Sequence, residues 1–174
     1  MKILISSIAF ILIASMAFAD DLTVKVDDKD VVLKRTSINH EIMPVDKSRG
    51  SQNSPMECTF LFYSLLAKGD IQGASKLSLD PAKTLEKWTN YMERIGGNDF
   101  RKGIEDYYAS NNIVLAELLL GDDTMLLIKS TDAITGQFYK KKDGKYFRSE
   151  MSSSDNLIIL GKVLTMIQEG KVKL

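Results

Sequence analysis

The stretch from Ile113 to Glu150 decides the fold: IVLAELLLGDDTMLLIKSTDAITGQFYKKKDGKYFRSE. Apolar segments of strand length alternate in it with turn residues, which is the pattern of antiparallel strands joined by short turns. Asp143-Gly144 gives the clearest turn, because a two-residue type I′ hairpin needs a positive φ at both central positions and Asp-Gly supplies it. We therefore expect an antiparallel sheet of about four strands, with one face covered by the helices predicted on either side of it.

The Asp143-Gly144 turn also predicts which side chains share a face of its hairpin. A two-residue loop brings residues at equal distances from the turn opposite each other. Phe138 and Phe147 then share the face that we expect to lie on the core. The other face combines aromatic rings with cations, a composition suited to binding a partner or an anionic ligand, although such pairs also stabilise hairpins that bind nothing. This predicted binding face carries Tyr139, Lys141, Tyr146 and Arg148.

The first 19 residues, MKILISSIAFILIASMAFA, have the three-part pattern of a secretory signal: an early lysine, an apolar run, and small residues before Asp20. The run from Ile3 to Met16 is shorter than the roughly 20 residues that a membrane span needs. A lipid anchor would need a cysteine just after the cleavage point, and the only cysteine is Cys58. We expect cleavage after Ala19, a periplasmic or secreted mature protein, and no stable membrane insertion.

The mature chain, 20–174, has the size of one domain. Residues 20–53 predict an N-terminal hairpin followed by an irregular, exposed loop from Thr36 to Asn53, and residues 54–174 predict the main α+β part. The whole chain carries 23 basic and 23 acidic residues, so its charge gives no sign of nucleic-acid binding.

The segment between the N-terminal hairpin and the strands that begin at Ile113 predicts three to four helices. Two of them begin with a capping residue followed by proline, Ser54-Pro55 and Asp80-Pro81. Apolar residues recur every three or four positions from Leu85 to Ile95, which predicts a buried stripe, and the same spacing after Ser152 predicts a C-terminal helix. The expected fold class is α+β: an N-terminal hairpin, three to four helices packed on an antiparallel sheet, and a C-terminal helix.

The sequence offers few residues for catalysis. With a single histidine and a single cysteine we expect no metal site, and no glycine-rich phosphate loop follows a predicted strand, so we expect no cofactor. Two acid–base candidates remain. The first is His40, with Glu41 or Asp46 to orient its ring, and its ordinary alternative is a solvated loop histidine. The second is Glu117, whose pKa would rise if it were buried without a partner; its alternatives are exposure to water or an ion pair with Lys129.

The order of helices followed by a long meander that ends in the KKKDGKYFRSE hairpin resembles the nuclear-transport-factor-like superfamily, the SnoaL-like proteins with a cystatin-like cone. The segment FLFYSLLAKGDIQGA, residues 60–74, is similar to the first helix of that family and its following turn, and the resemblance covers about 54–151. It implies helices packed on a strongly curved sheet to form a cone, often with an apolar pocket. The hairpin before the helices and the helix after the sheet depart from the family. Its enzymes use an Asp or His inside the cone, and no residue here matches one.

These observations predict a non-enzymatic exported binding protein. It would recognise a partner protein, as an inhibitor or an immunity-like antagonist does, or a small apolar ligand. The expected contact surfaces are the loop from Thr36 to Asn53 and the aromatic–basic face of the hairpin. The alternative is a small acid–base enzyme, an isomerase or hydrolase that uses His40 or Glu117 on the same scaffold. A homodimer formed through the open face of the sheet is a further alternative.

Overall fold

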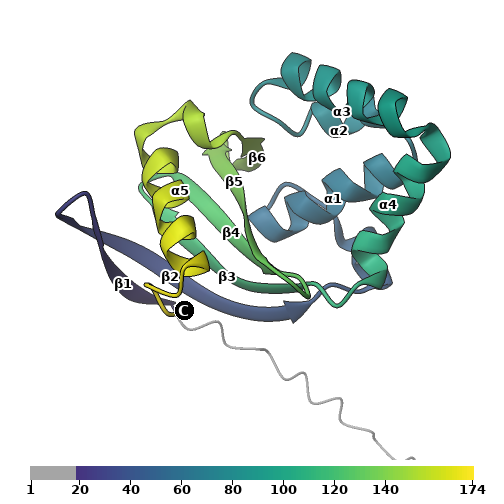
Figure 1. Ribbon diagram of the computed structural model, residues 1–174. Coiled ribbons are helices and arrows are strands. Elements are labelled where there is room, and N and C mark those ends of the chain that lie inside the picture. The colour runs from purple at the N-terminus through teal and green to yellow at the C-terminus, as the bar shows by residue number, and fades with distance from the viewer. Residues whose placement is uncertain (1–18) are drawn as a thin grey trace, which may run out of the picture.

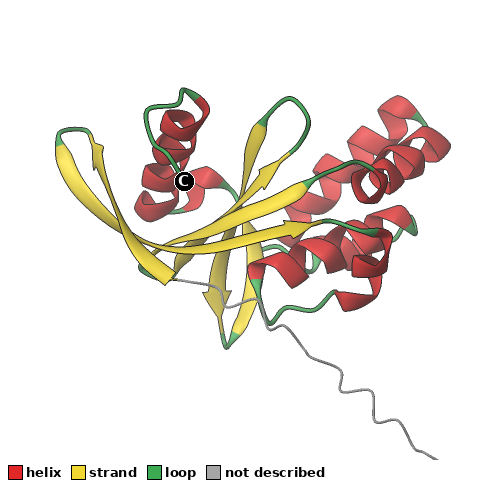
Figure 2. Cartoon of the chain, turned by 90° about the horizontal axis from the view of Figure 1, so that it is seen from below, coloured by secondary structure: helices red, strands yellow, loops and turns green. Residues whose placement is uncertain are grey.

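The computed structural model of the protein describes residues 19–174, so the predicted signal segment lies outside the described residues except for Ala19. The α+β class and the C-terminal helix are confirmed. The sheet is antiparallel and curved, and its six strands follow one another in sequence order (Figures 1 and 2). Among residues 19–174, no helix combines the length and the apolar character needed to cross a membrane.

The strands are β1 (Ala19–Val26), β2 (Lys29–Glu41), β3 (Ile113–Leu120), β4 (Asp123–Lys129), β5 (Ile134–Lys142) and β6 (Lys145–Ser149). The helices are α1 (Pro55–Ala67), α2 (Ile71–Ser75), α3 (Pro81–Ile95), α4 (Gly97–Ala109) and α5 (Asp155–Gln168), with two short 3-10 segments, η1 (Pro44–Arg49) and η2 (Met151–Ser153).

The helix starts follow the capping residues in the sequence. The Ser54 side chain accepts a hydrogen bond from the backbone N–H of Glu57, and Asp80 does the same for Lys83, as the cap-then-proline pattern predicts. The C-terminal helix α5 begins in the same way, with Ser154 as its cap. These side chains satisfy backbone donors that the first turn of a helix leaves without a partner.

The sheet has six strands instead of about four, because the N-terminal hairpin belongs to it. Strand β2 pairs with β3, with Thr36 opposite Glu117 and His40 opposite Val114. The predicted loop from Thr36 to Asn53 is therefore wrong for its first residues, which continue the strand. The reason is a bulge between Ser37 and His40, where Asn39 has a φ of 51°, since a bulge interrupts the alternation by which a strand is recognised.

The hairpin of β5 and β6 has the predicted register. Tyr139 lies opposite Arg148 and Lys141 opposite Tyr146. The turn residues Asp143 and Gly144 have φ values of 51° and 77°, as a type I′ turn requires.

Helices cover both faces of the sheet, so the expectation that they cover one face is wrong. Helix α5 lies on one face, and α1 and α4 lie on the other (Figure 1). Strand β4 contributes to both cores: Leu126 packs in the core that contains α1, and Leu127 in the core that contains α5. The run MLLI in β4 has no polar alternation, which is typical of a strand buried on both faces.

The outer edge of β6 is closed by segments that precede α1 and α3. The Arg148 N–H donates to the Leu77 carbonyl oxygen at 2.8 Å, and the Leu79 N–H donates to the Arg148 carbonyl oxygen at 2.9 Å. Further along the strand, the Tyr146 N–H donates to the Gln52 carbonyl oxygen at 2.9 Å. These bonds satisfy an edge that would otherwise offer free backbone groups, and they hold β6 close to the start of α3.

Gly50 allows a test of how η1 packs on α1. A Cβ atom at this position would lie 2.6 Å from both the N and the Cα of Leu61, and this backbone belongs to a helix that cannot easily move. We expect Gly50→Ala to lower the free energy of unfolding by about 1–3 kcal/mol, the usual cost of overpacking. Urea denaturation followed by circular dichroism measures the change.

Gly97→Ala is the matched control, since a Cβ there meets nothing within 4 Å. It should stay within about 0.5 kcal/mol of the parent protein. Equal effects of the two substitutions would contradict the close packing at Gly50.

Candidate ligand-binding site

An apolar pocket of about 660 Å³ lies between α3 and α4. Its walls are aromatic and aliphatic, whereas its polar side chains all come from α3. The apolar lining consists of Trp88, Tyr91, Phe100 and Ile104. The polar lining consists of Lys87, Asn90 and Arg94.

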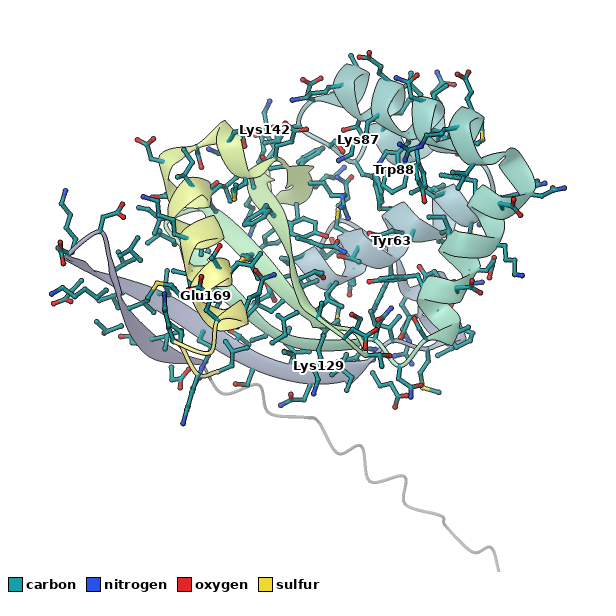
Figure 3. All side chains as sticks on the ribbon, viewed as in Figure 1. Tyr63, Lys87, Trp88, Lys129, Lys142 and Glu169 are labelled. Carbon is teal, nitrogen blue, oxygen red and sulfur yellow. The ribbon has the colours of Figure 1, made fainter. Side chains whose placement is uncertain are left out.

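The position of α3 explains why this space is not filled. The helix has the predicted apolar stripe, but none of its residues is fully buried, which corrects the expectation of a buried stripe. Its neighbours are α2 and α4 rather than the sheet. Trp88 reaches inward from α3 towards α1, where its ring centroid lies 5.7 Å from that of Phe62 (Figure 3). Across the pocket, Gly103 of α4 contributes no side chain, and a Cβ there would meet nothing within 4 Å.

A second, polar pocket of about 330 Å³ adjoins the first, and the two share Lys87 and Trp88. It lies between the start of α3, the end of β6 and η2. Its hydroxyl groups belong to Ser78, Thr84, Ser149, Ser152 and Ser153. Its charged residues are Lys83, Lys87, Arg148, Asp80 and Glu150.

Two of these charges are bound to each other. The Lys83 ammonium lies 2.6 Å from the Glu150 carboxylate, and the Asp80 carboxylate accepts the backbone N–H of Lys83 as the cap of α3. Lys87 and Arg148 take part in no ion pair within residues 19–174. The polar pocket therefore presents cations that the protein itself does not neutralise.

Arg148 projects from β6 into an aromatic environment. The guanidinium carbon lies 4.2 Å from the ring centroid of Phe62 and 5.6 Å from that of Tyr63. Its Nη1 donates to Oε1 of Gln137 at 2.7 Å. Aromatic faces attract a cation, but they do not neutralise its charge or occupy the remaining four N–H donors of an arginine.

The titratable groups beneath Arg148 stay neutral at physiological pH. Burial raises the pKa of Tyr139 and of Tyr107, and burial also raises the pKa of the Cys58 thiol to about 11. The Tyr139 hydroxyl donates to Oε1 of Gln137 at 2.9 Å, so the same amide oxygen holds both the phenol and the guanidinium. None of these groups supplies a negative charge to Arg148.

The structure splits the predicted binding face of the hairpin. Tyr139 is fully buried under α1, so its side chain does not reach the surface, while Arg148 reaches the polar pocket. Lys141 and Tyr146 lie nearer the turn, with the lysine ammonium 5.3 Å from the tyrosine ring centroid. Phe138 packs in the core beneath α5, as predicted for its face, so this part of β5 is covered on both sides.

The side chains of His40 and Asp46 are in contact. Asp46 is one of the two residues, with Glu41, predicted to orient the His40 ring. His40 Nε2 lies 2.9 Å from Oδ2 of Asp46, and the fully buried Asp46 also accepts the Met43 N–H at 2.9 Å. Glu41 is exposed at the end of β2. His40 lines neither of the two pockets, and its contact with Asp46 ties the end of β2 to η1.

Glu117 is half-buried in the middle of β3, and it lines neither pocket. Lys129, its predicted alternative partner, lies opposite Ile113 at the other end of the strand. Burial raises the pKa of the Glu117 carboxyl. Within residues 19–174, no group of three His, Cys, Asp or Glu side chains is arranged to hold a metal ion.

The pockets contain several residues that the sequence reading does not single out. Trp88 and the residues around it show a helical stripe, and such a stripe normally indicates a core contact. Lys87 and Gly103 carry no local signal at all. Only the packing of α3 against α4 turns these residues into the lining of one pocket.

Comparison of the chain with protein-family models, with curated proteins and with solved structures gives no match. The resemblance to the nuclear-transport-factor-like superfamily therefore stays a prediction. The function has to be argued from the two pockets and the charges that line them.

The raised pKa of Glu117 predicts a pH-dependent effect of its removal. The fold favours the protonated carboxyl, so the contribution of Glu117 to stability is largest below its ordinary pKa and falls as the pH rises through the raised value. Glu117→Gln, which resembles the protonated form, should raise the free energy of unfolding at pH 7, with a smaller gain at pH 4. Urea denaturation at the two pH values measures it.

The exposed Glu93→Gln serves as the control and should change little at either pH. A gain for Glu117→Gln that is the same at pH 4 and pH 7 would show that ionisation of Glu117 in a buried site is not its cause.

Proposed function

We propose that the protein is an exported, non-enzymatic binding protein that holds a small apolar ligand between α3 and α4. The observation that carries this proposal is the apolar pocket of about 660 Å³. Its volume and its apolar walls, which include three aromatic rings, match small-molecule sites, which typically measure about 300–1,000 Å³. Export rests on the sequence of the first 19 residues.

Contacts among the rings support a pocket that exists before the ligand arrives. The Trp88 ring makes edge contacts with Phe62 and Phe100, at centroid distances of 5.7 and 6.0 Å, and Tyr91 lies 6.0 Å from Phe100. Tyr91 remains 38% exposed, a large aromatic surface that a ligand would cover. Burial of such surface is worth about 25 cal/mol per Å².

A small ligand has more support than a protein partner. One surface expected to contact a partner includes Tyr139, which is fully buried, and the other includes residues 36–41, which pair with β3 in the sheet. The acid–base alternative has less support as well, because neither His40 nor Glu117 lines either pocket.

Substitution of Gly103 tests the proposal directly. Gly103→Leu places a side chain in the empty space of the pocket and removes a glycine from the interior of α4, so it should block the ligand without weakening the helix. The probe is N-phenyl-1-naphthylamine, a neutral apolar dye that fluoresces in apolar surroundings. We expect the purified protein to bind the dye and Gly103→Leu to weaken binding at least tenfold.

Gly103→Ala is the matched control, since it makes the same change of backbone propensity and fills little of the pocket. It should bind the dye within about twofold of the parent protein, a shift well below the 1.4 kcal/mol that a tenfold change represents. Trp88 is the only tryptophan, so its own fluorescence reports whether the dye enters this pocket. Unchanged Trp88 emission, or equal binding by Gly103→Leu, would refute the proposal.

A further inference from the structure

We propose that the ligand carries a single carboxylate, which Arg148 and Lys87 bind in the polar pocket while its apolar part fills the space between α3 and α4. This inference rests on the proposed function, because it assigns the head group of the same ligand. It defines the ligand class as an amphiphile with one negative charge.

The electrostatic argument begins with Arg148. Removal of a cation from water is costly unless an anion or a set of hydrogen-bond acceptors replaces the lost solvation. Gln137 supplies one acceptor, and the Tyr139 phenol and the Cys58 thiol remain neutral because burial raises the pKa of each. A ligand carboxylate would supply the missing negative charge and could accept two N–H bonds from the planar guanidinium.

The charge of the polar pocket selects a monoanion. Its lining contains three cations and two carboxylates, so the net charge is +1. Lys83 already binds Glu150, which leaves Lys87 and Arg148 for the ligand. A dianion, such as a phosphate monoester, would exceed this charge and lie beside Asp80 and Glu150, which would repel it.

The arrangement of the two pockets joins the head to the tail. Lys87 and Trp88 line both, so a chain that lies along Trp88 passes from the apolar lining to the cations. Figure 3 shows Lys87 and Trp88 next to each other on α3, on the side of the helix that faces the rest of the protein. The hydroxyl groups of the polar pocket offer further donors to a carboxylate.

Ligands that share one chain and differ in the head group separate these possibilities. The four probes are decanoate, decanol, decyl phosphate and decyltrimethylammonium, each used at pH 7.5 below its micelle concentration. Displacement of N-phenyl-1-naphthylamine measures their affinities. We expect decanoate to bind at least tenfold more tightly than decanol, decyl phosphate to bind more weakly than decanoate, and the cationic probe to bind most weakly.

Substitutions assign the head-group site to particular residues. In Arg148→Met and in Lys87→Met, the ratio of decanoate affinity to decanol affinity should fall towards one. Both affinities are measured on the same variant, because Lys87 also lines the apolar pocket. Arg148→Lys keeps the positive charge but loses the paired N–H donors of the guanidinium, so it should retain part of the preference for decanoate over decanol. Lys129→Met, at the lower end of the sheet in Figure 3 and away from Lys87, makes the same change of charge as Lys87→Met and should have no effect.

The outcomes distinguish the two proposals. If neither the dye nor decanol binds, the proposed function fails. If both bind but decanoate gains nothing over decanol, the proposed function stands and the carboxylate site is refuted. Tighter binding of decyl phosphate than of decanoate would overturn the monoanion assignment. If Arg148→Met does not fold, Lys87→Met and Arg148→Lys still test the head-group site. An unchanged preference for decanoate over decanol in both variants excludes these residues from it.

Discussion

Burial of β4 on both faces is the constraint from which the rest of the structure follows. Leu126 and Ile128 point into one core, and Met125 and Leu127 point into the other. A strand in which four successive side chains are apolar, as from Met125 to Ile128, cannot turn either face to water there, so the chain has to supply helices on both sides. Helix α5 covers one side with its own buried stripe, and α1 covers the other.

The same constraint explains where the pockets lie. Four helices follow β2, but α1 already covers the sheet with Phe60 and Phe62, so α3 packs outside it, against its neighbours. An outer helix of this kind has too few partners to bury its stripe. Closure of the β6 edge then brings the start of α3 next to Arg148. Apolar and cationic surfaces thus meet at α3 because of how the layers are stacked.

Local signals were readable in the sequence, and contacts between distant segments were not. Asp143-Gly144 predicts the pairing of Tyr139 with Arg148 because the turn alone fixes it. The continuation of β2 depends on β3, and the bulge near Asn39 conceals it. Arg148 is predicted as a binding residue from its strand partners, but the pocket that it lines forms only because the residues before α3 close the edge of β6. The sequence around Gly103 does not predict the pocket, because a missing side chain leaves a space only where residues of another helix surround it.

The low burial of α3 has a dynamic consequence. Local stability follows the amount of buried contact, and α3, which has no fully buried residue, would be expected to open before the sheet or α1. Such an opening would widen the apolar pocket while the backbone pairing of β3 to β6 stayed intact. The depth of the pocket would then depend on the position of a single helix. A molecule bound beneath it would tie that helix to β6 and slow the exchange of its amide hydrogens with solvent.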